Sequence, residues 1–328
     1  MKHLSIIVPN GENNLSSIVG AYKIFTRANS VWREKYGADR FKTELVGVSD
    51  EVLFHQGLFS AKPHTQISNV EHTDLIIIPS LNHNYEMALN ENELLVKWLV
   101  KQYKAGASIA SICTGAFLLA STGLLDNKSC STHWSVHDTF RQIFPRVRLK
   151  TDKLITDENG IYTNGGAYSF LNLIVYLVEK FFDRATAIYC AKIFQIDLDR
   201  NLQSEFSIFN GHKKHEDELV LKAQLYIEEN YQDKISFERL ATGLNVGRRN
   251  FDRRFIKATG FTPLNYLQRV KIERAKKNFE NTRKTVNEVM YDVGYNDTKA
   301  FREVFSRITG MSPISYKSKY NKENSLLL

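Results

Sequence analysis

The chain has 328 residues and a net charge of +8, and its 43% hydrophobic and 12% aromatic residues exclude a disordered or fibrous protein and allow two domains. No run of eighteen apolar residues occurs, and the first residues lack the apolar length and cleavage site of a signal peptide. We therefore expect a cytoplasmic protein without a membrane partner. Cys113, Cys130 and Cys190 are widely spaced, which predicts reduced thiols rather than a disulfide framework.

The charge is divided unevenly along the chain. Residues 1–232 carry 24 Lys+Arg and 26 Asp+Glu, whereas residues 233–322 carry 20 and 9. Such an excess of basic residues is typical of a domain that binds a polyphosphate such as nucleic acid. A basic surface that only serves solubility gives the same excess of Lys and Arg. A nucleic-acid partner is therefore expected at the last quarter of the chain.

Short apolar runs alternate with helical patterns in the first two hundred residues. Strands are expected at Leu4–Val8, Leu45–Val48, Leu75–Ile78, Ser108–Ile112 and Ile161–Thr163, and helices at Ser16–Ala28, Glu91–Ala105, Ala116–Thr122 and Phe170–Phe182. This alternation predicts a flavodoxin-like α/β domain over residues 1–200, with a mostly parallel sheet flanked by helices. Ligands bind such sheets beyond the carboxyl ends of the strands.

One turn in this domain contains a residue that could be reactive. The segment Ser111–Leu119 passes from an apolar strand through a tight turn into a helix, with Cys113 at the elbow. A thiol at a helix N-terminus is expected to have a lowered pKa, as in a nucleophile elbow. Cysteine is equally common as a small buried apolar residue, so the motif alone leaves both interpretations open.

Longer segments around this turn carry a family resemblance. SICTGAFLLASTGLL (111–125), STHW (131–134), FPRVRL (144–149) and IYTNGG (161–166) resemble the PfpI-like, class I glutamine-amidotransferase-like superfamily. More narrowly, they resemble the GlxA-type regulators, which join such a domain to an AraC-type tail. The resemblance implies that Cys113 is the family's elbow cysteine and that His133 is its partner histidine.

Two departures from this family favour a binding domain over an enzyme. Ser17 stands where catalytic relatives have a carboxylate, and Pro79-Ser80-Leu81 stands where relatives often have a Gly-Gly that helps to build an oxyanion hole. Without the acid, Cys113 and His133 are an incomplete set for nucleophilic chemistry. We expect a small-molecule effector to bind at Ser17, Ser80, Cys113, Thr114 and His133. The alternative is a Cys113-dependent amidase, protease or deglycase-like hydrolase.

No cofactor and no metal ion are expected. Cys130 and His133 have half of a zinc-binding spacing without an evident second half, and Gly165-Gly166 does not belong to a dinucleotide-binding pattern. The polar segment 201–217 is expected to be a linker between the α/β domain and an all-α domain over residues 218–322.

The C-terminal segment contains an internal repeat. Residues 255–266 (FIKATGFTPLNY) recur as residues 305–316 (FSRITGMSPISY), and the match continues upstream. Each copy is expected to form a short helix, a turn and a second helix, with Ser236 and Thr285 as N-caps. A helix over residues 264–280 is expected to join the copies and to hold their second helices about one DNA turn, ~34 Å, apart.

The second helix of each copy is expected to read DNA. Phe251 and Phe255 form its apolar stripe in the first copy, and Phe301 and Phe305 form it in the second. The other positions are polar or basic, which suits a helix in the major groove. The expected DNA-binding residues are Arg248, Arg249, Asn250, Arg253, Asn296, Thr298, Lys299 and Arg302, and Arg254 is expected among the polar positions outside the apolar stripe of the first of these helices.

Residues 219–320 resemble an AraC-type DNA-binding domain. The resemblance lies in Leu240-Ala241, the helix Arg248 to Phe255, the Thr259-Gly260-x-x-Pro263-x-x-Tyr266 tail, Arg269 to Ala275, and Gly294-Tyr295. The complete pattern predicts a ligand-sensing transcription regulator. Its expected partners are double-stranded DNA, an unidentified small molecule, a second copy of the chain in a homodimer, and RNA polymerase. A constitutive architectural DNA-binding protein is a further alternative.

Overall fold

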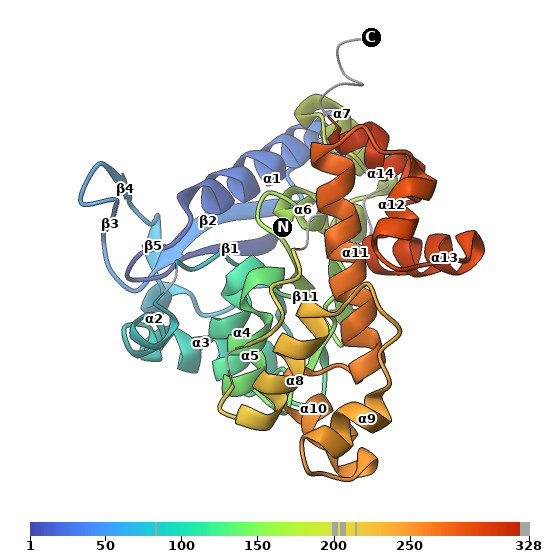
Figure 1. The fold of residues 1–328 in the computed structure, drawn as a ribbon. Helices are drawn as coiled ribbons and strands as arrows, with labels where there is room; N and C mark the ends of the chain where they lie inside the picture. Colours follow the sequence, from blue (N-terminus) through green and yellow to red (C-terminus); the bar gives the residue numbers. More distant parts are fainter. Residues whose placement is uncertain (83, 199–202, 204–207, 214, 322–328) are drawn as a thin grey trace. The chain divides into compact units, whose positions relative to one another are not determined.

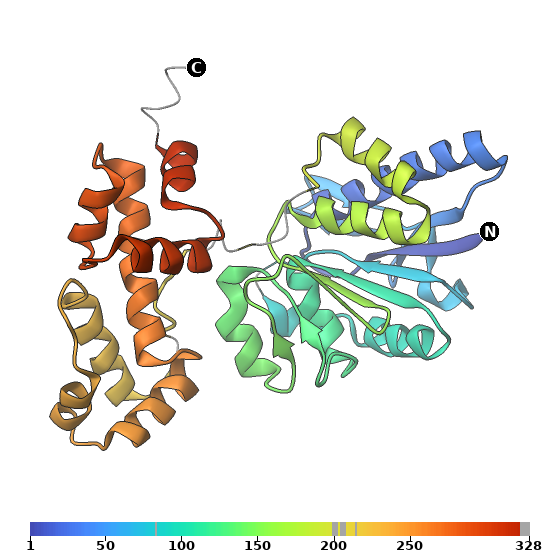
Figure 2. The same ribbon diagram turned by 90° about the vertical axis from the view of Figure 1, so that its right-hand side faces the viewer.

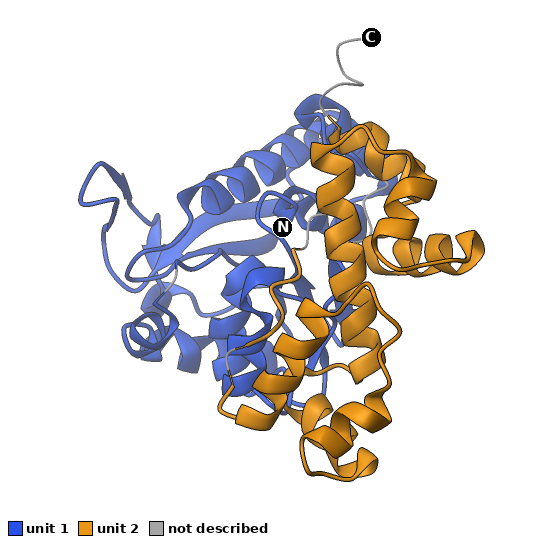
Figure 3. Ribbon diagram, in the orientation of Figure 1, with its two compact units in different colours: residues 1–203 blue, residues 204–328 orange. Residues whose placement is uncertain are grey.

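The computed structural model describes residues 1–82, 84–198, 203, 208–213 and 215–321 (Figure 1). The chain forms two compact units, Met1–Gln203 and Ser204–Leu328, which Figure 3 shows in different colours. The segment 201–217, expected to be a linker, lies outside the described residues at positions 201, 202, 204–207 and 214. Among the described residues, none of the helices is long and apolar enough to cross a membrane.

Unit 1 is built around a seven-stranded sheet with the order β10-β11-β7-β6-β1-β2-β5. In that order the strands are Ile155–Glu158, Ile161–Asn164, Ser108–Ile112, Leu75–Ile78, Lys2–Val8, Phe41–Gly47 and Thr65–Gln66. All neighbouring strands are parallel except β10 and β11. Two small sheets accompany it, formed by β3 (Val52–Phe54) with β4 (Phe59–Ala61) and by β8 (Ser129–Cys130) with β9 (Arg148–Leu149).

Helices cover both faces of this sheet (Figure 2). Successive strand residues point to opposite faces, so Ile6 belongs to one apolar core and Ile7 to the other. On the Ile6 face lie α1 (Leu15–Tyr36), α6 (Phe170–Phe181) and α7 (Arg184–Phe194). On the Ile7 face lie α2 (Tyr85–Asn90), α3 (Glu93–Lys104), α4 (Ala116–Ser121) and α5 (His137–Ile143). Three single turns, η1 (Ile67–Asn69), η2 (Cys113–Gly115) and η3 (Trp134–Val136), complete the unit.

The predicted fold class is confirmed, and each predicted strand overlaps an observed one. The helix predicted over Glu91–Ala105 corresponds to α3, and the short helix α2 that precedes it was not predicted. Asn92 lies at the break, where its buried amide donates to the carbonyl oxygens of Asn10 and Ala88. A side chain that satisfies these carbonyl groups favours a separate helix start over a continuous helix.

Unit 2 consists of helices around two apolar cores. The helices are α8 (Glu218–Glu229), α9 (Phe237–Gly243), α10 (Arg248–Thr259), α11 (Pro263–Asn281), α12 (Val286–Asp292), α13 (Thr298–Thr309) and α14 (Pro313–Tyr320). The first half of α11 packs with Phe251 and Phe255 of α10, and its second half packs with Phe301 and Phe305 of α13. In Figure 1, α10 lies by the lower end of α11 and α13 lies to the right of α11.

The repeat in the sequence is also a repeat of side-chain contacts. Ser236 and Thr285 cap α9 and α12, as predicted, by accepting from backbone N–H groups. Tyr266 donates to Glu228 at 2.6 Å in the first copy. In the second copy, Tyr316 donates to Glu280 at 2.5 Å. Both copies therefore use a buried tyrosine to satisfy a carboxylate of another helix segment.

The turns between the paired helices match as well. Asn245 has φ +56° in the first copy, and Gly294 has φ +73° in the second. Asparagine and glycine are the residues that tolerate this left-handed conformation best. At Gly294 an added Cβ would lie 2.0 Å from the carbonyl oxygen of Gln232, so only glycine fits there. These turns set the directions in which α10 and α13 leave them.

Candidate functional site

The exposed face of α10 carries both unpaired and paired cations. Arg249 is exposed and has no ion-pair partner in the described part of the chain. Arg248 donates Nε to both carboxylate oxygens of Asp252 at 2.9 Å, and Arg253 donates to Asn250 Oδ1 at 3.1 Å. Such contacts at the surface are weak, about 0–1 kcal/mol, so a phosphate or base edge can replace them. Arg249 is the cation most readily available to a ligand.

Arg254 also lies outside the apolar stripe of α10, but it makes a different set of contacts. Its Nε and Nη2 donate to the two carboxylate oxygens of Asp217 at 2.9 and 2.7 Å. Asp217 is the N-cap of α8, and the Arg254 guanidinium lowers the pKa of its carboxyl. Arg254 therefore ties α10 to the start of α8.

The second helix of the second copy, α13, has its own arrangement of charges. Lys299 and Arg302 are exposed, and neither has an ion-pair partner among the residues that the structure describes. Asn296 is exposed just before the helix, Asp297 caps it by accepting from the Ala300 N–H group at 2.8 Å, and Thr298 is half-buried in its first turn. The predicted cations of α13 are thus on its solvent-facing side, opposite the phenylalanine stripe.

The single helix α11 contributes to both apolar cores of unit 2. The helix has 19 residues, and a rise of 1.5 Å per residue gives about 28 Å. This length is close to the ~34 Å between successive major-groove faces on one side of B-DNA. A single continuous helix through both cores also limits relative motion of the two copies.

The elbow of unit 1 brings four of the five predicted pocket residues together. Cys113 follows β7 with φ +54° and is 5% exposed. The hydroxyl oxygens of Ser80 and Thr114 lie 2.7 Å apart, and Thr114 Oγ1 donates to the carbonyl oxygen of Leu81 at 2.7 Å. The Ser80 N–H group donates to Ser17 Oγ at 3.2 Å. These residues lie beyond the carboxyl ends of β6 and β7, where ligands of parallel sheets bind.

Burial raises the pKa of the Cys113 thiol, although the contacts with Ser80 and Thr114 lower it. The predicted lowering of this pKa is therefore wrong. Cys113 lies in the single turn η2, and α4 begins only at Ala116 and has six residues. Desolvation of a thiolate in this buried position outweighs the stabilisation that the short helix and the hydroxyl groups offer. The thiol is consequently neutral at neutral pH.

His133 directly follows Thr132, the residue through which this segment bonds to the elbow. It caps η3, its Nδ1 atom lies 2.7 Å from Ser135 Oγ, and its ring centroid lies 5.3 Å from that of Trp134. The preceding residue, Thr132, donates Oγ1 to the carbonyl oxygen of Cys113 at 2.8 Å. The predicted histidine segment and the elbow are therefore joined through Thr132.

Tyr85 is a residue of this site that the sequence did not single out. Its ring stacks on Phe117 with centroids 3.9 Å apart, and its buried hydroxyl group has no hydrogen-bond partner among the described residues. Burial, together with the nearby Cys113, raises the pKa of Tyr85 to about 12. The phenol is therefore neutral at neutral pH, and its buried O–H group is a donor without an acceptor among the described residues. A single tyrosine in a polar stretch of sequence does not indicate that its hydroxyl group is buried.

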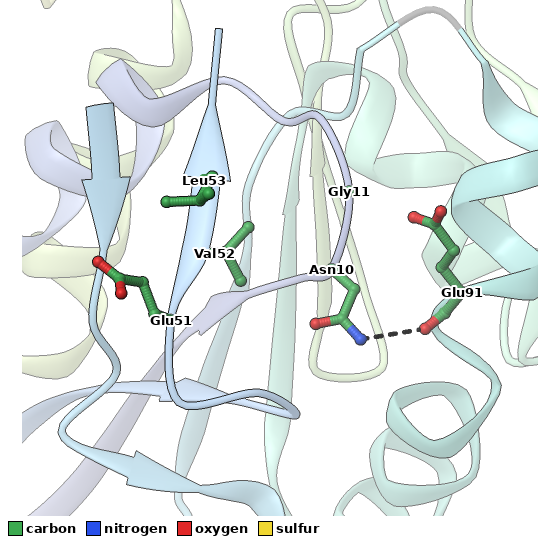
Figure 4. Close-up of a pocket in the computed structure, with 6 residues that line it drawn as sticks. All are labelled: Asn10, Gly11, Glu51, Val52, Leu53 and Glu91. Carbon is green, nitrogen blue, oxygen red and sulfur yellow. Dashed lines mark hydrogen bonds between the residues drawn. The ribbon is translucent and has the colours of Figure 1, made fainter. Parts of the chain in front are cut away.

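A separate hollow lies at the carboxyl ends of β1 and β2 and does not include the predicted pocket residues. It has a volume of about 380 Å³ and is lined by Asn10, Gly11, Glu51, Val52, Leu53 and Glu91. Figure 4 shows Glu51 and Glu91 on opposite sides of Gly11, with Asn10 bonded to the Glu91 carbonyl group. No group of three or more His, Cys, Asp or Glu that could hold a metal ion is found within the described ranges.

Two family models match the chain. The DJ-1/PfpI family model matches residues 20–180, which include the sheet and the elbow. A helix-turn-helix domain model matches residues 240–319, which include α10, α11 and α13.

Curated relatives match across both units. The HTH-type transcriptional regulator GbdR of Pseudomonas aeruginosa is 26% identical over 219 residues, 66% of this chain and 59% of that protein. The regulator CdhR of the same species is 20% identical over 85% of this chain and 82% of its own length. The regulator GlxA of Rhizobium meliloti is 24% identical over 66% of this chain and 67% of its own length. The match to GbdR thus spans less than two thirds of that relative.

Solved structures share the fold of unit 1. A putative transcriptional regulator from Vibrio parahaemolyticus has a TM-score of 0.53 and 23% identity, and the match covers 58% of this chain and 98% of that one. Drosophila melanogaster DJ-1beta has a TM-score of 0.51 and 19% identity, with 60% and 98% covered. At these identities the likeness concerns the fold alone. Together with the family models, it shows that the chain consists of a DJ-1/PfpI domain followed by a helix-turn-helix domain.

Proposed function

We propose that this chain is a transcription regulator that binds double-stranded DNA through α10 and α13. The observation that carries the proposal is the exposure of Arg249, Lys299 and Arg302 on the second helices of two helix-turn-helix copies built on one α11. The names of the curated relatives as transcriptional regulators support it. The proposed contact residues are Arg248, Arg249, Asn250, Arg253, Asn296, Thr298, Lys299 and Arg302.

DNA affinity of single variants tests this proposal. The full chain first selects its binding site from a random DNA library, and fluorescence anisotropy then measures the affinity at one fixed salt concentration. Arg249→Ala and Arg302→Ala should each weaken binding about 5- to 150-fold, the equivalent of ~1–3 kcal/mol for a bidentate base contact. Lys101→Ala removes an exposed cation from α3 of unit 1 and serves as the control. Equal affinity of wild type and the Arg249→Ala, Arg302→Ala double variant contradicts the proposal.

Unit 1 is proposed to bind a small-molecule effector at the elbow. Ser17, Ser80, Cys113, Thr114 and His133 form the proposed pocket, and the free hydroxyl group of Tyr85 supplies a further hydrogen-bond donor. The raised pKa of Cys113 and the hydroxyl of Ser17 in place of a carboxylate favour binding over nucleophilic catalysis. The Tyr85 hydroxyl group and the Cys113 thiol are both neutral donors, so the effector is proposed to place an acceptor oxygen against them.

Thermal shift measurements over a metabolite library test the effector site. A ligand that raises the melting temperature of the wild type should act less on Tyr85→Phe and Cys113→Ser, since each removes a proposed contact. A library without any stabilising compound favours a constitutive DNA-binding protein. Turnover of amide or carbonyl substrates by the wild type, and not by Cys113→Ser, overturns the sensing proposal in favour of a hydrolase.

Three partner assignments complete the proposal. Paired half-sites in DNA are commonly read by two-fold assemblies, so a homodimer formed through unit 1 is proposed. A transcription regulator acts on DNA that RNA polymerase transcribes, so we propose RNA polymerase as a further partner. For the same reason we propose that the protein is located in the cytoplasm. Sedimentation at several protein concentrations tests the dimer.

A further inference from the structure

The loop before α9 in the first helix-turn-helix copy contacts the turn before α13 in the second copy. The carbonyl oxygen of Gln232 lies so close to Gly294 that an added Cβ there would be 2.0 Å from it. Lys271, near the middle of α11, donates Nζ to the carbonyl oxygen of Gly294 at 3.0 Å. This lysine is 8% exposed, and its Nζ atom lies 5.1 Å from the centroid of the Tyr295 ring. We refer to Gln232, Lys271 and Gly294 as the junction of the two copies.

Two neighbours of Gln232 in the same loop extend this contact. Tyr231 is partly buried and packs against both apolar cores of unit 2. The guanidinium carbon of Arg274, on α11, lies 5.5 Å from the centroid of the Tyr231 ring. Burial lowers the pKa of Lys271, whereas the carboxylate of Asp233 raises it. The loop of the first copy is therefore bound to α11 and to the second copy by packing and by charge.

The two copies differ at this place. The loop before α9 (residues 230–236) is longer than the loop before α12 (residues 282–285). When the tyrosine-bound carboxylates of α8 and α11 are aligned, Leu219 takes the place of Lys271. The turn of the first copy, at Asn245, is exposed. The longer loop and the buried lysine therefore occur together at the place where the two copies meet.

The rotation of the two copies about α11 is the quantity that such a contact controls. One helix that joins two bodies sets their separation, whereas a contact between the bodies also sets their rotation about the helix axis. In B-DNA, one base pair moves the next contact by ~3.4 Å and rotates it by about 35°. A fixed rotation of α13 relative to α10 therefore distinguishes DNA segments whose separation differs by one base pair.

Stability alone does not account for a lysine at this place. Burial of its ammonium group costs free energy that an apolar side chain of similar length does not cost. Buried polar groups instead serve, in some proteins, to select one arrangement of packed elements over others. Lys271 has its acceptor in the turn before α13, and Asp233 attracts it from the loop before α9. It therefore favours the arrangement in which this turn and this loop lie close together.

We propose that the junction fixes the rotation of α13 relative to α10 and thereby makes the protein selective for the spacing of the two DNA segments that it binds. Lys271 is the positioning residue, because it acts on the direction of α13 through the Gly294 carbonyl group. The spacing selectivity rests on the proposed function, whereas the rotation depends only on contacts within unit 2.

Affinities for DNA of altered spacing test this proposal with the full chain. The selected site is compared, at one salt concentration, with two sites that have one base pair more or one fewer between the segments that one chain contacts. The wild type should bind each altered site at least about 5-fold more weakly, the smallest loss expected for one bidentate base contact. Lys271→Met keeps the length of the side chain and should remove most of this penalty. A wild type that binds all three sites equally overturns the proposal.

A matched control separates rotation from the loss of a positive charge. Lys277 lies on the same helix with an exposed side chain, so Lys277→Met removes the same charge without changing the junction. Each variant lowers the general attraction to DNA, which affects all three sites alike. The spacing penalty should therefore stay at the wild-type value in Lys277→Met and fall in Lys271→Met. An equal penalty in both variants overturns the role of Lys271 in spacing.

Distances between spin labels test the junction without DNA. Labels are placed on Lys257→Cys in α10 and Glu303→Cys in α13, both exposed positions, while the three native thiols are buried. The distance distribution should be broader in Lys271→Met than in the wild type and in Lys277→Met. Identical distributions for the wild type and Lys271→Met overturn the junction. A chain that binds no DNA but shows the broader distribution refutes the proposed function and supports the junction as the contact that fixes the rotation.

Discussion

Substitution of Gly294 tests the turn that directs α13. Its φ of +73° costs an alanine roughly 1–2 kcal/mol. The new Cβ would lie 2.0 Å from the Gln232 carbonyl oxygen and 2.9 Å from Lys271 Nζ. Because Lys271 donates to the Gly294 carbonyl oxygen at 3.0 Å, the displacement also removes a charged hydrogen bond of about 1.5–3 kcal/mol. Gly294→Ala should therefore destabilise unit 2 by about 3–5 kcal/mol.

The first copy of the repeat supplies the controls. Asn245 holds the same place in its turn with φ +56° and is exposed. Gly294→Asn tolerates the left-handed conformation but keeps the clash, so it should lose most of the stability that Gly294→Ala loses. Asn245→Gly should change stability by no more than ~0.5 kcal/mol, because glycine accepts the same conformation.

Urea unfolding of the full chain with two probes measures these effects. Trp32, Trp98 and Trp134 are the three tryptophans, and all lie in unit 1, so their fluorescence reports that unit, while circular dichroism at 222 nm reports the helices of both. With a slope of ~1–1.5 kcal/mol per molar urea, a loss of 3 kcal/mol lowers the midpoint of unit 2 by about 2–3 M. An unchanged circular dichroism midpoint for Gly294→Ala refutes the steric reasoning.

Three further outcomes are expected. Tyr266→Phe leaves a carboxylate without the donor that contacts it at 2.6 Å and should destabilise unit 2 by about 1.5–3 kcal/mol; an unchanged urea midpoint contradicts this. Hydrogen bonds from Arg254 lower the pKa of Asp217, so the stability from this pair is present above pH ~4 and is lost as pH falls through the lowered folded pKa. Asp217→Asn should therefore flatten the decline of the urea midpoint between pH 5 and 2, and an equal slope counts against the pair. Cys113, buried and neutral, should react with iodoacetamide at pH 7.5 as slowly as buried Cys130, and mass spectrometry that finds rapid modification of Cys113 alone opposes its raised pKa.

The sequence predicts most of unit 2 because the repeat is a local pattern. Phe251, Phe255, Phe301 and Phe305 are all fully buried, as their helical spacing predicts. The pairing of Arg254 with Asp217 was not predictable, because these residues are 37 positions apart and meet only through the packing of α8 on α10. A helical wheel therefore overstates the number of arginine side chains on α10 that are free of ion-pair partners.

In unit 1 the position of the elbow was predictable and its properties were not. The strand–turn–helix pattern that places Cys113 lies within a few residues. The pKa of the thiol depends on its burial and on Ser80, which comes from a different strand end. Tyr85 lies in a polar segment without periodicity, so nothing in the local sequence marks it as buried.

A hydroxyl-radical footprint on the selected DNA tests most directly whether both helix-turn-helix copies bind. Two reader helices joined by a rigid α11 predict, for each chain, two protected segments on one face of the duplex, with centres about one helical turn, 10–10.5 base pairs, apart. Arg249→Ala should weaken protection mainly in one segment, and Arg302→Ala should weaken it mainly in the other. A single protected segment per chain that is insensitive to one of these substitutions contradicts the proposal that both α10 and α13 read DNA.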